Sequence, residues 1–217
     1  MSDYFTHPNR HGAFPPVVQS LLIGNIIIFI VQALGYHEPL LINFALWPVG
    51  TPPTAPDFQI WQLVSYAFLH GNFLHIFLNM FVLWMFGTQM EYTWGSRRFL
   101  FYYFFCVIGA GLTQLYVVSG ATQGIFPTVG ASGGVFGILL AFGMRFPNQY
   151  ILLLIPPIPM KAKYFVLVVG LITLYFGMTG TQGGIAHFAH LGGMVAGLLL
   201  ILYWRGKLPF KPRNRMR

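Results

Sequence analysis

The stretch TVGASGGVFGILLAFGMR, residues 128–145, opens on a serine set among glycines and closes on an arginine. The residues from Ser132 to Arg145 are mostly apolar, which predicts a membrane helix of unusual shortness. At about 1.5 Å per residue it covers roughly 20 Å, whereas a bilayer core is about 30 Å thick. If Arg145 marks one membrane surface, Ser132 lies roughly 10 Å below the other. We therefore expect irregular backbone before Ser132, either buried in protein or lining a cavity.

The composition of the whole chain supports a membrane setting. Of the 217 residues, 56% are hydrophobic and 7% are charged, whereas about 25% of the residues of a soluble domain are charged. The net charge is +8, but no basic run is interleaved with stacking aromatics, so nucleic acid is not an expected partner. The single cysteine, Cys106, excludes a disulfide framework and a thiolate metal site, and we expect it to be a buried apolar filler.

Six apolar segments are candidates for membrane-spanning helices. A bilayer core needs about 20 apolar residues in a helix, and the fourth segment falls short of this. The sequence predicts an all-α membrane protein, one domain over residues 1–217, with a six-helix bundle whose short fourth helix starts at mid-membrane depth. The predicted spans are residues 17–34, 74–90, 99–118, 132–145, 164–178 and 185–204, followed by a basic tail over 205–217.

The positions of the basic residues support this count. All 12 Lys and Arg fall on one side of a six-span arrangement, and the opposite loops hold none. By the positive-inside rule the basic side is cytoplasmic, so both termini are expected there. The nearly uncharged loop 35–73 is expected to lie in the membrane interface. The basic residues are Arg10, Arg97, Arg98, Arg145, Lys161, Lys163, Arg205, Lys207, Lys211, Arg213, Arg215 and Arg217.

Two polar residues are expected at the same membrane depth. Ser132 opens the fourth span, where a serine is either a helix cap or a nucleophile beside the free N–H groups of a helix start. His190 lies five residues into the sixth span, roughly 8 Å deep. A histidine at that depth indicates a functional site, the alternative being a hydrogen bond to another helix.

Glycines provide a means of bringing these two spans together. Small residues four apart on a helix allow close backbone approach in lipid, although such pairs also occur without any catalytic role. The glycines are Gly133 and Gly137 in the fourth span, and Gly193 and Gly197 in the sixth. Phe136, one turn after Ser132, is placed to lie against the imidazole of His190.

A third polar cluster lies in HGNFLHIFLN, residues 70–79. His75 and Asn79 share one helix face, where they either donate hydrogen bonds to an oxyanion or join neighbouring helices. His70, just before the span, is expected to tie loop 35–73 to the core. These histidines, with His187 and His190, also raise the alternative of zinc. No H-E-x-x-H motif occurs and no carboxylate lies in the outer half of any span, so no metal is expected. His187 is expected in a polar cavity wall.

Three motifs taken together resemble the rhomboid family of intramembrane serine proteases, in its minimal six-helix bacterial form. They are H-x4-H-x3-N in HGNFLHIFLN, G-x-S-G in GASG (Gly130 to Gly133), and A-H-x2-G-x3-G in AHLGGMVAG. They occur in family order on spans two, four and six, and the resemblance extends from about residue 17 to 204. Soluble hydrolases also carry G-x-S-G, but there it follows a strand.

The resemblance implies a Ser–His dyad without a third acid. Ser132 is then the nucleophile, His190 the general base, and the oxyanion hole consists of His75, Asn79 and the N–H of Ser132. Some family members have a tyrosine at the position of Phe136. The first loop reads Trp61-Gln62 where the family often has Trp-Arg.

The family also implies a location and a class of partner. We expect no cofactor, single-span membrane proteins as substrates, and the lipid bilayer as surroundings. The expected location is the cell inner (plasma) membrane, with the active site open to the outer, periplasmic side. Two alternatives stay open: a catalytically inactive rhomboid-fold protein that binds membrane clients, and a small transporter with intramembrane histidines.

Overall fold

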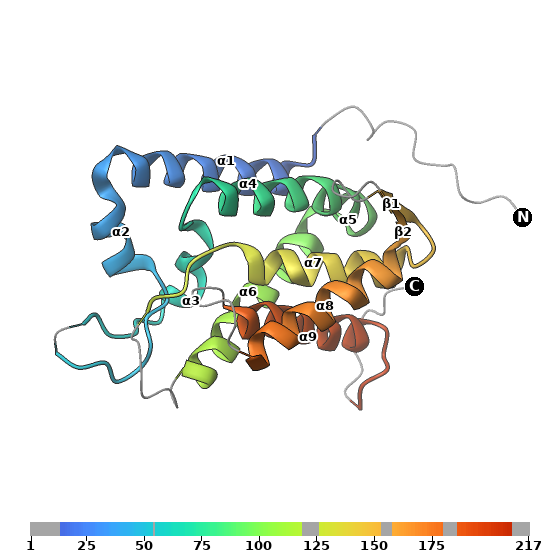
Figure 1. Cartoon of the computed structure of the whole chain (residues 1–217). Coiled ribbons are helices and arrows are strands. Elements are labelled where there is room, and N and C mark those ends of the chain that lie inside the picture. Colours follow the sequence, from blue (N-terminus) through green and yellow to red (C-terminus); the bar gives the residue numbers. More distant parts are fainter. Residues whose placement is uncertain (1–13, 54, 119–125, 153–157, 180–185, 210–217) are drawn as a thin grey trace, which may run out of the picture.

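The computed structural model of the protein describes residues 14–53, 55–118, 126–152, 158–179 and 186–209 (Figure 1). Most of them are helical, as expected, apart from one short antiparallel hairpin. The elements are α1 (Pro16–Val31), η1 (Gln32–Tyr36), α2 (His37–Phe44), α3 (Gln62–Ser65), η2 (Tyr66–Phe68), α4 (Phe73–Val82), η3 (Leu83–Gly87), α5 (Thr88–Trp94), α6 (Ser96–Val118), α7 (Ser132–Arg145), β1 (Tyr150–Leu152), β2 (Pro159–Lys161), α8 (Ala162–Thr179) and α9 (His187–Trp204).

Five helical stretches are long and apolar enough to cross a membrane. They are Pro16–Phe44, Phe73–Trp94, Ser96–Val118, Ala162–Thr179 and His187–Trp204. The remaining apolar helix, α7, has only 14 residues, which is the length that the sequence predicts. Ile185, predicted to open the last span, lies outside the described residues, as do Arg10 and positions 210–217 of the predicted tail.

The first helical stretch continues beyond its predicted end at residue 34. Gly35 adopts a φ of 103° inside η1, a conformation that glycine accepts at little cost. The chain kinks there and resumes as α2, so part of the predicted interface loop 35–73 is helical. The helices α2 and α3 both belong to this loop.

Helix α7 lies at the centre of the bundle. Nine of its 14 residues are buried, whereas α1 buries only three of 16. Figure 1 shows α7 between α4 on one side and α8 and α9 on the other, and α6 packs against both α7 and α9. The start of α7 is therefore enclosed by several helices, and Gly130 and Ala131 just before it are buried as well.

Close backbone contact joins α7 to α9. A Cβ added to Gly193 would overlap the carbonyl of Gly133, so no larger residue fits there. Gly137 and Gly197 serve a different contact, because a Cβ on either would collide with Cys106 or Tyr102 of α6. The expected glycine packing is thus present, but the α7–α9 backbone contact is made by one glycine of each predicted pair, Gly133 and Gly193. Cys106 is fully buried, as expected.

A buried carboxylate ties the start of α1 to two other helices. Glu91 of α5 is 3% exposed and accepts hydrogen bonds from the main-chain N–H groups of Val17 and Val18 at 3.1 and 2.8 Å. It also accepts one from Ser96 Oγ at 2.7 Å. The first N–H groups of a helix have no partner within it, and a negative charge beside them is favourable. Glu91 therefore caps α1 from a distance.

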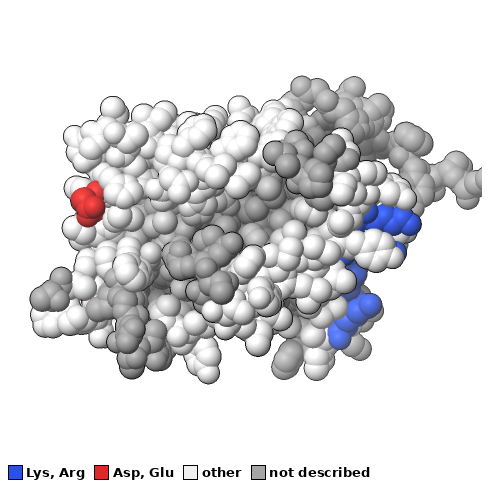
Figure 2. Space-filling model, viewed as in Figure 1, with Lys and Arg blue, Asp and Glu red and all other residues white. Residues whose placement is uncertain are grey.

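Basic side chains collect at one end of the molecule. Figure 2 shows Lys and Arg gathered at the end where α7 stops and α8 begins, with the visible acidic residue at the opposite end. The hairpin of β1 and β2 lies at this basic end and pairs Tyr150 with Lys161, Ile151 with Met160 and Leu152 with Pro159. The described cations thus follow the one-sided distribution seen in the sequence.

Substitution of Gly193 by alanine is expected to destabilise the bundle. The added methyl group would overlap the backbone of Gly133, and overpacking of this kind costs about 1–3 kcal/mol. Thermal unfolding in detergent measures the loss. Gly24→Ala is the matched control, because a Cβ there meets only Phe68, 3.8 Å away, and alanine favours a helix. An equal loss in both variants would contradict the close α7–α9 contact.

Substitution of Glu91 by glutamine is expected to lower the free energy of unfolding by about 1–3 kcal/mol, since buried donors lose a charged acceptor. Chemical denaturation in mixed micelles measures this change. Glu38→Gln removes a carboxylate from an exposed position on α2 and should shift the free energy by no more than about 0.5 kcal/mol. Similar changes in the free energy of unfolding for the two variants would show that the Glu91 hydrogen bonds do not stabilise the fold.

Candidate active site

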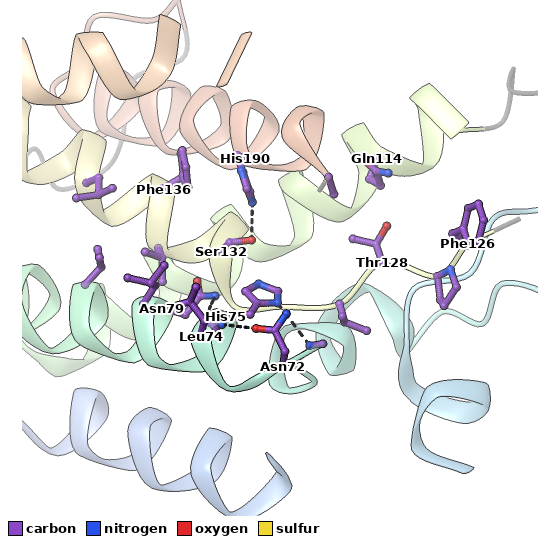
Figure 3. A pocket seen from close by; sticks show the side chains of 18 of the residues that line it. Asn72, Leu74, His75, Asn79, Gln114, Phe126, Thr128, Ser132, Phe136 and His190 are labelled. Atoms are coloured by element: carbon purple, nitrogen blue, oxygen red, sulfur yellow. Dashed lines mark hydrogen bonds between the residues drawn. The ribbon is translucent and has the colours of Figure 1, made fainter. Parts of the chain in front are cut away.

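A cavity of about 690 Å³ opens among α4, α6, α7 and α9. Figure 3 shows Ser132 and His190 on one wall, with His75 and Asn79 on the facing helix. All four line the cavity, as does Phe136. The sequence-predicted polar residues of spans two, four and six are therefore brought to one place.

The chain enters α7 as extended backbone held by two neighbouring segments. Thr128 and Leu46 exchange both of their main-chain hydrogen bonds, at 2.9 and 3.0 Å, and the N–H of Gly130 donates to the carbonyl of Tyr66 at 2.9 Å. This non-helical backbone is thus satisfied by protein, as a segment away from water must be.

Ser132 does not act as the cap of its helix. The N-cap position is Ala131, and no side chain caps the first turn. Ser132 is the first helical residue, so its own N–H is one of the free donors at the helix start. Its hydroxyl is directed instead toward another helix, which removes the capping alternative left open by the sequence.

The hydroxyl of Ser132 is hydrogen-bonded to the imidazole of His190. Ser132 Oγ and His190 Nε2 lie 2.8 Å apart (Figure 3). The ring of Phe136 stacks on His190 with centroids 4.2 Å apart and planes 13° from parallel. This stacking fixes the orientation of the imidazole, so that Nε2 faces the serine. A hydroxyl hydrogen-bonded to an imidazole in this way is the arrangement that a serine nucleophile and its general base require.

His75 faces Ser132 across Gly130. A Cβ on Gly130 would lie 2.7 Å from His75 Nε2 and 3.7 Å from Ser132 Oγ, and Gly130 has a φ of 123°. Only glycine suits this position. The N–H of Gly71 lies 3.5 Å from His75 Nδ1, a long hydrogen bond that favours the neutral tautomer with its proton on Nε2. That N–H is therefore directed toward the side of the ring that faces Gly130 and the cavity.

Asn79 lies one turn after His75 on the same face of α4. Its Nδ2 donates to the carbonyl of His75 at 2.9 Å. An amide nitrogen carries two hydrogens, so the second is available to an acceptor in the cavity. His75 and Asn79 thus offer two N–H donors on the side facing Ser132.

His70 is held through its main chain. Its N–H donates to Gln32 Oε1 at 3.1 Å, and Gln32 Nε2 donates back to its carbonyl at 3.2 Å. The ring meets the ring of His75 edge-on, with centroids 5.1 Å apart. Burial, with a smaller contribution from His75, lowers the pKa of His70 to about 3. The His70 ring is therefore neutral and packs against His75. The main chain of His70 connects this segment to η1 through Gln32.

His187 does not lie in the wall of the cavity, where the sequence analysis placed it. It is buried between α9 and α8, with its ring centroid 5.7 Å from that of Phe176 and 6.1 Å from that of His190. Among the described residues, no group of three His, Cys, Asp or Glu side chains is arranged to hold a metal ion.

Three polar residues of the cavity were not singled out from the sequence: Asn72, Gln114 and Thr128. Asn72 caps α4 by accepting from the N–H of His75 at 2.9 Å, and an asparagine before an apolar helix is a recognisable cap signal. Gln114 is an amide within a predicted apolar span, which is itself an indication of function. Thr128 has no comparable signal.

Comparison with known proteins places the chain in a family. Residues 57–207 match the family model described as the Rhomboid domain. The chain belongs to the rhomboid family. With its several apolar helices, this rhomboid is a multi-pass membrane protein.

Three relatives illustrate the likeness of this rhomboid to known proteins. It is 31% identical to Rhomboid protease GlpG of Yersinia pestis over 192 residues, covering 87% of this chain and 62% of that protein. It is 27% identical to Rhomboid-like protease 3 of Toxoplasma gondii over 199 residues, covering 89% and 71%. It is 34% identical to the mitochondrial Rhomboid protein 1 of Saccharomyces cerevisiae over 142 residues, covering 64% and 40%. The chain thus spans less than two thirds of two of these relatives.

Proposed function

We propose that this rhomboid is a serine endopeptidase that cleaves membrane proteins in or near their transmembrane segments. The observation that carries the proposal is the 2.8 Å hydrogen bond between Ser132 Oγ and His190 Nε2. Membership of a family whose relatives are named proteases supports it. The inactive-protein and transporter alternatives are less well supported, because the dyad and its facing donors share one cavity.

The proposed reaction begins with the serine hydroxyl donating its proton to His190 Nε2. Ser132 Oγ then attacks the scissile carbonyl carbon, and a tetrahedral intermediate forms. Its oxyanion accepts hydrogen bonds from His75 Nε2–H, the free hydrogen of Asn79 Nδ2 and the main-chain N–H of Ser132. His190 returns the proton to the leaving amine, and water subsequently hydrolyses the acyl-enzyme.

The proposed membrane arrangement uses α7 as a sixth, short span. Its 14 residues reach only about 20 Å, so Ser132 sits below one bilayer surface when Arg145 lies at the other. The one-sided basic residues support a cytoplasmic position for that surface and for both termini, by the positive-inside rule. The cavity then opens toward the outer, periplasmic side of the inner membrane. In this proposal the chain forms one domain and uses neither a cofactor nor a metal.

Single-span membrane proteins are the proposed substrates, as the family implies. A peptide in a stable helix keeps its carbonyl groups in hydrogen bonds, so the segment must unwind to reach Ser132. The cavity is lined by the polar groups of Asn72, Gln114 and Thr128 and also by apolar side chains such as Val82 and Leu139. The exposed peptide groups of an unwound segment need hydrogen-bond partners, and these polar side chains can provide them, which supports this proposal.

Removal of either dyad residue is expected to abolish proteolysis. In Ser132→Ala and His190→Ala, kcat for a transmembrane model substrate should fall by about 1,000-fold or more, because the two groups act as a unit. Labelling by a fluorophosphonate probe should be lost in Ser132→Ala. Ser20→Ala, on α1 and outside the cavity, is the control. Undiminished cleavage by Ser132→Ala, or a wild type that neither cleaves nor labels, would overturn the proposed function.

Substitution of Gly130 by alanine is expected to reduce kcat by at least about tenfold, since the methyl group displaces the His75 ring from the oxyanion. Gly50→Ala is the matched control: Gly50 also has a positive φ of 73°, but nothing lies within 4 Å of its added Cβ. The control therefore carries backbone strain without the collision. Comparable kcat values in both variants would contradict this role of Gly130.

A further inference from the structure

His187 has a buried ring nitrogen that the site described so far does not use. The residue is 8% exposed, and its Nε2 atom has no hydrogen-bond partner. Buried polar atoms are rarely left unpaired, because the loss of hydration is costly. Packing against Phe176 accounts for an aromatic ring at this position, but it does not account for the ring nitrogen.

The ring of His187 lies beside that of the proposed general base. The rings of His187 and His190 are 6.1 Å apart and stand at 84° to each other. They lie one turn apart on α9, and the main-chain N–H of His190 donates to the carbonyl of Ala186 at 3.2 Å, so the backbone there is helical. Two hydrogen bonds in series reach about 5.5 Å, which makes one water a suitable bridge between these rings.

His190 needs an acceptor that nothing else in the described part of the chain provides. Its Nε2 must be free to take the proton of Ser132, so the proton of the neutral ring sits on Nδ1. When Nε2 is protonated, the ring becomes a cation, which a hydrogen-bond acceptor at Nδ1 would stabilise. Among the described residues, no carboxylate lines the cavity, and the ring of Phe136 contacts one face of the imidazole without accepting at its edge.

We propose that His187 is the positioning residue of this dyad: its Nε2 accepts a hydrogen bond, through one water, from Nδ1–H of His190 and stabilises the imidazolium during catalysis. The inference rests on the proposed protease function and adds a third member to the dyad. The proton of neutral His187 is then on Nδ1. No proton passes to His187, because the one taken from Ser132 stays on His190 Nε2 until the leaving amine receives it.

Two substitutions of similar volume separate a hydrogen-bond role from packing. His187→Leu fills the space without an acceptor, whereas His187→Gln keeps one. The His187→Leu variant should lose kcat by about tenfold, the scale of a hydrogen bond to a charged group, with KM unchanged within about twofold. The His187→Gln variant should recover most of that loss. Fluorophosphonate labelling of Ser132 should slow in His187→Leu by a similar factor, because it also needs His190 as base.

The controls distinguish this inference from the function on which it rests. Thermal unfolding of both variants in the same detergent shows whether the α8–α9 contact survives. If His187→Leu cleaves and labels like wild type, the inference is wrong while the protease function stands. If both variants lose activity and stability equally, His187 is a packing residue and the inference is also wrong. If wild type itself neither cleaves nor labels, the proposed function fails and the inference with it.

Discussion

The contact between the backbones of Gly133 and Gly193 determines the geometry of the site. Lipid is as apolar as a leucine side chain, so helices in a membrane gain little from hydrophobic burial and depend on close packing. Ser132 directly precedes Gly133, and His190 lies one turn before Gly193. The 2.8 Å distance between serine and histidine is therefore a consequence of helix packing. Phe136, on the same helix as the serine, then fixes the remaining freedom of the imidazole.

Much of this site could be predicted from the sequence because its signals are local. A polar residue in an apolar span is conspicuous, and helical spacing shows which residues share a face. Depth could be estimated by counting residues from Arg145, and this paired Ser132 with His190. His75 and Asn79 followed from their spacing of four. The short α7 was likewise evident, since its length is bounded by the serine and the arginine.

The parts that the sequence did not indicate depend on partners far apart in the chain. Gln32 binds the main chain of His70, 38 residues away. A single glutamine at the end of an apolar segment gives no indication in the sequence of which residue it will bind. Gly197 has the expected spacing, but it packs against Tyr102 of α6 because three helices meet there. The helix α2 follows a glycine and contains a proline, both typical of loops, but Gly35 takes up the positive φ of the kink and Pro39 lies in the first turn of α2, where a proline is tolerated. His187 lies against Phe176 of α8, a contact between two helices that its position in the sequence does not indicate.

The capping of α1 by Glu91 has a consequence for how the chain assembles. The acceptor lies 73 residues after the N–H group of Val18 that it binds, so α1 is synthesised well before its cap exists. Until α5 emerges, the first turn of α1 has only water or lipid headgroups as partners, and a helix end is prone to fray without a cap. Glu91 also binds Ser96 at the start of α6. The start of α1 therefore gains this cap only when the α5–α6 corner has formed.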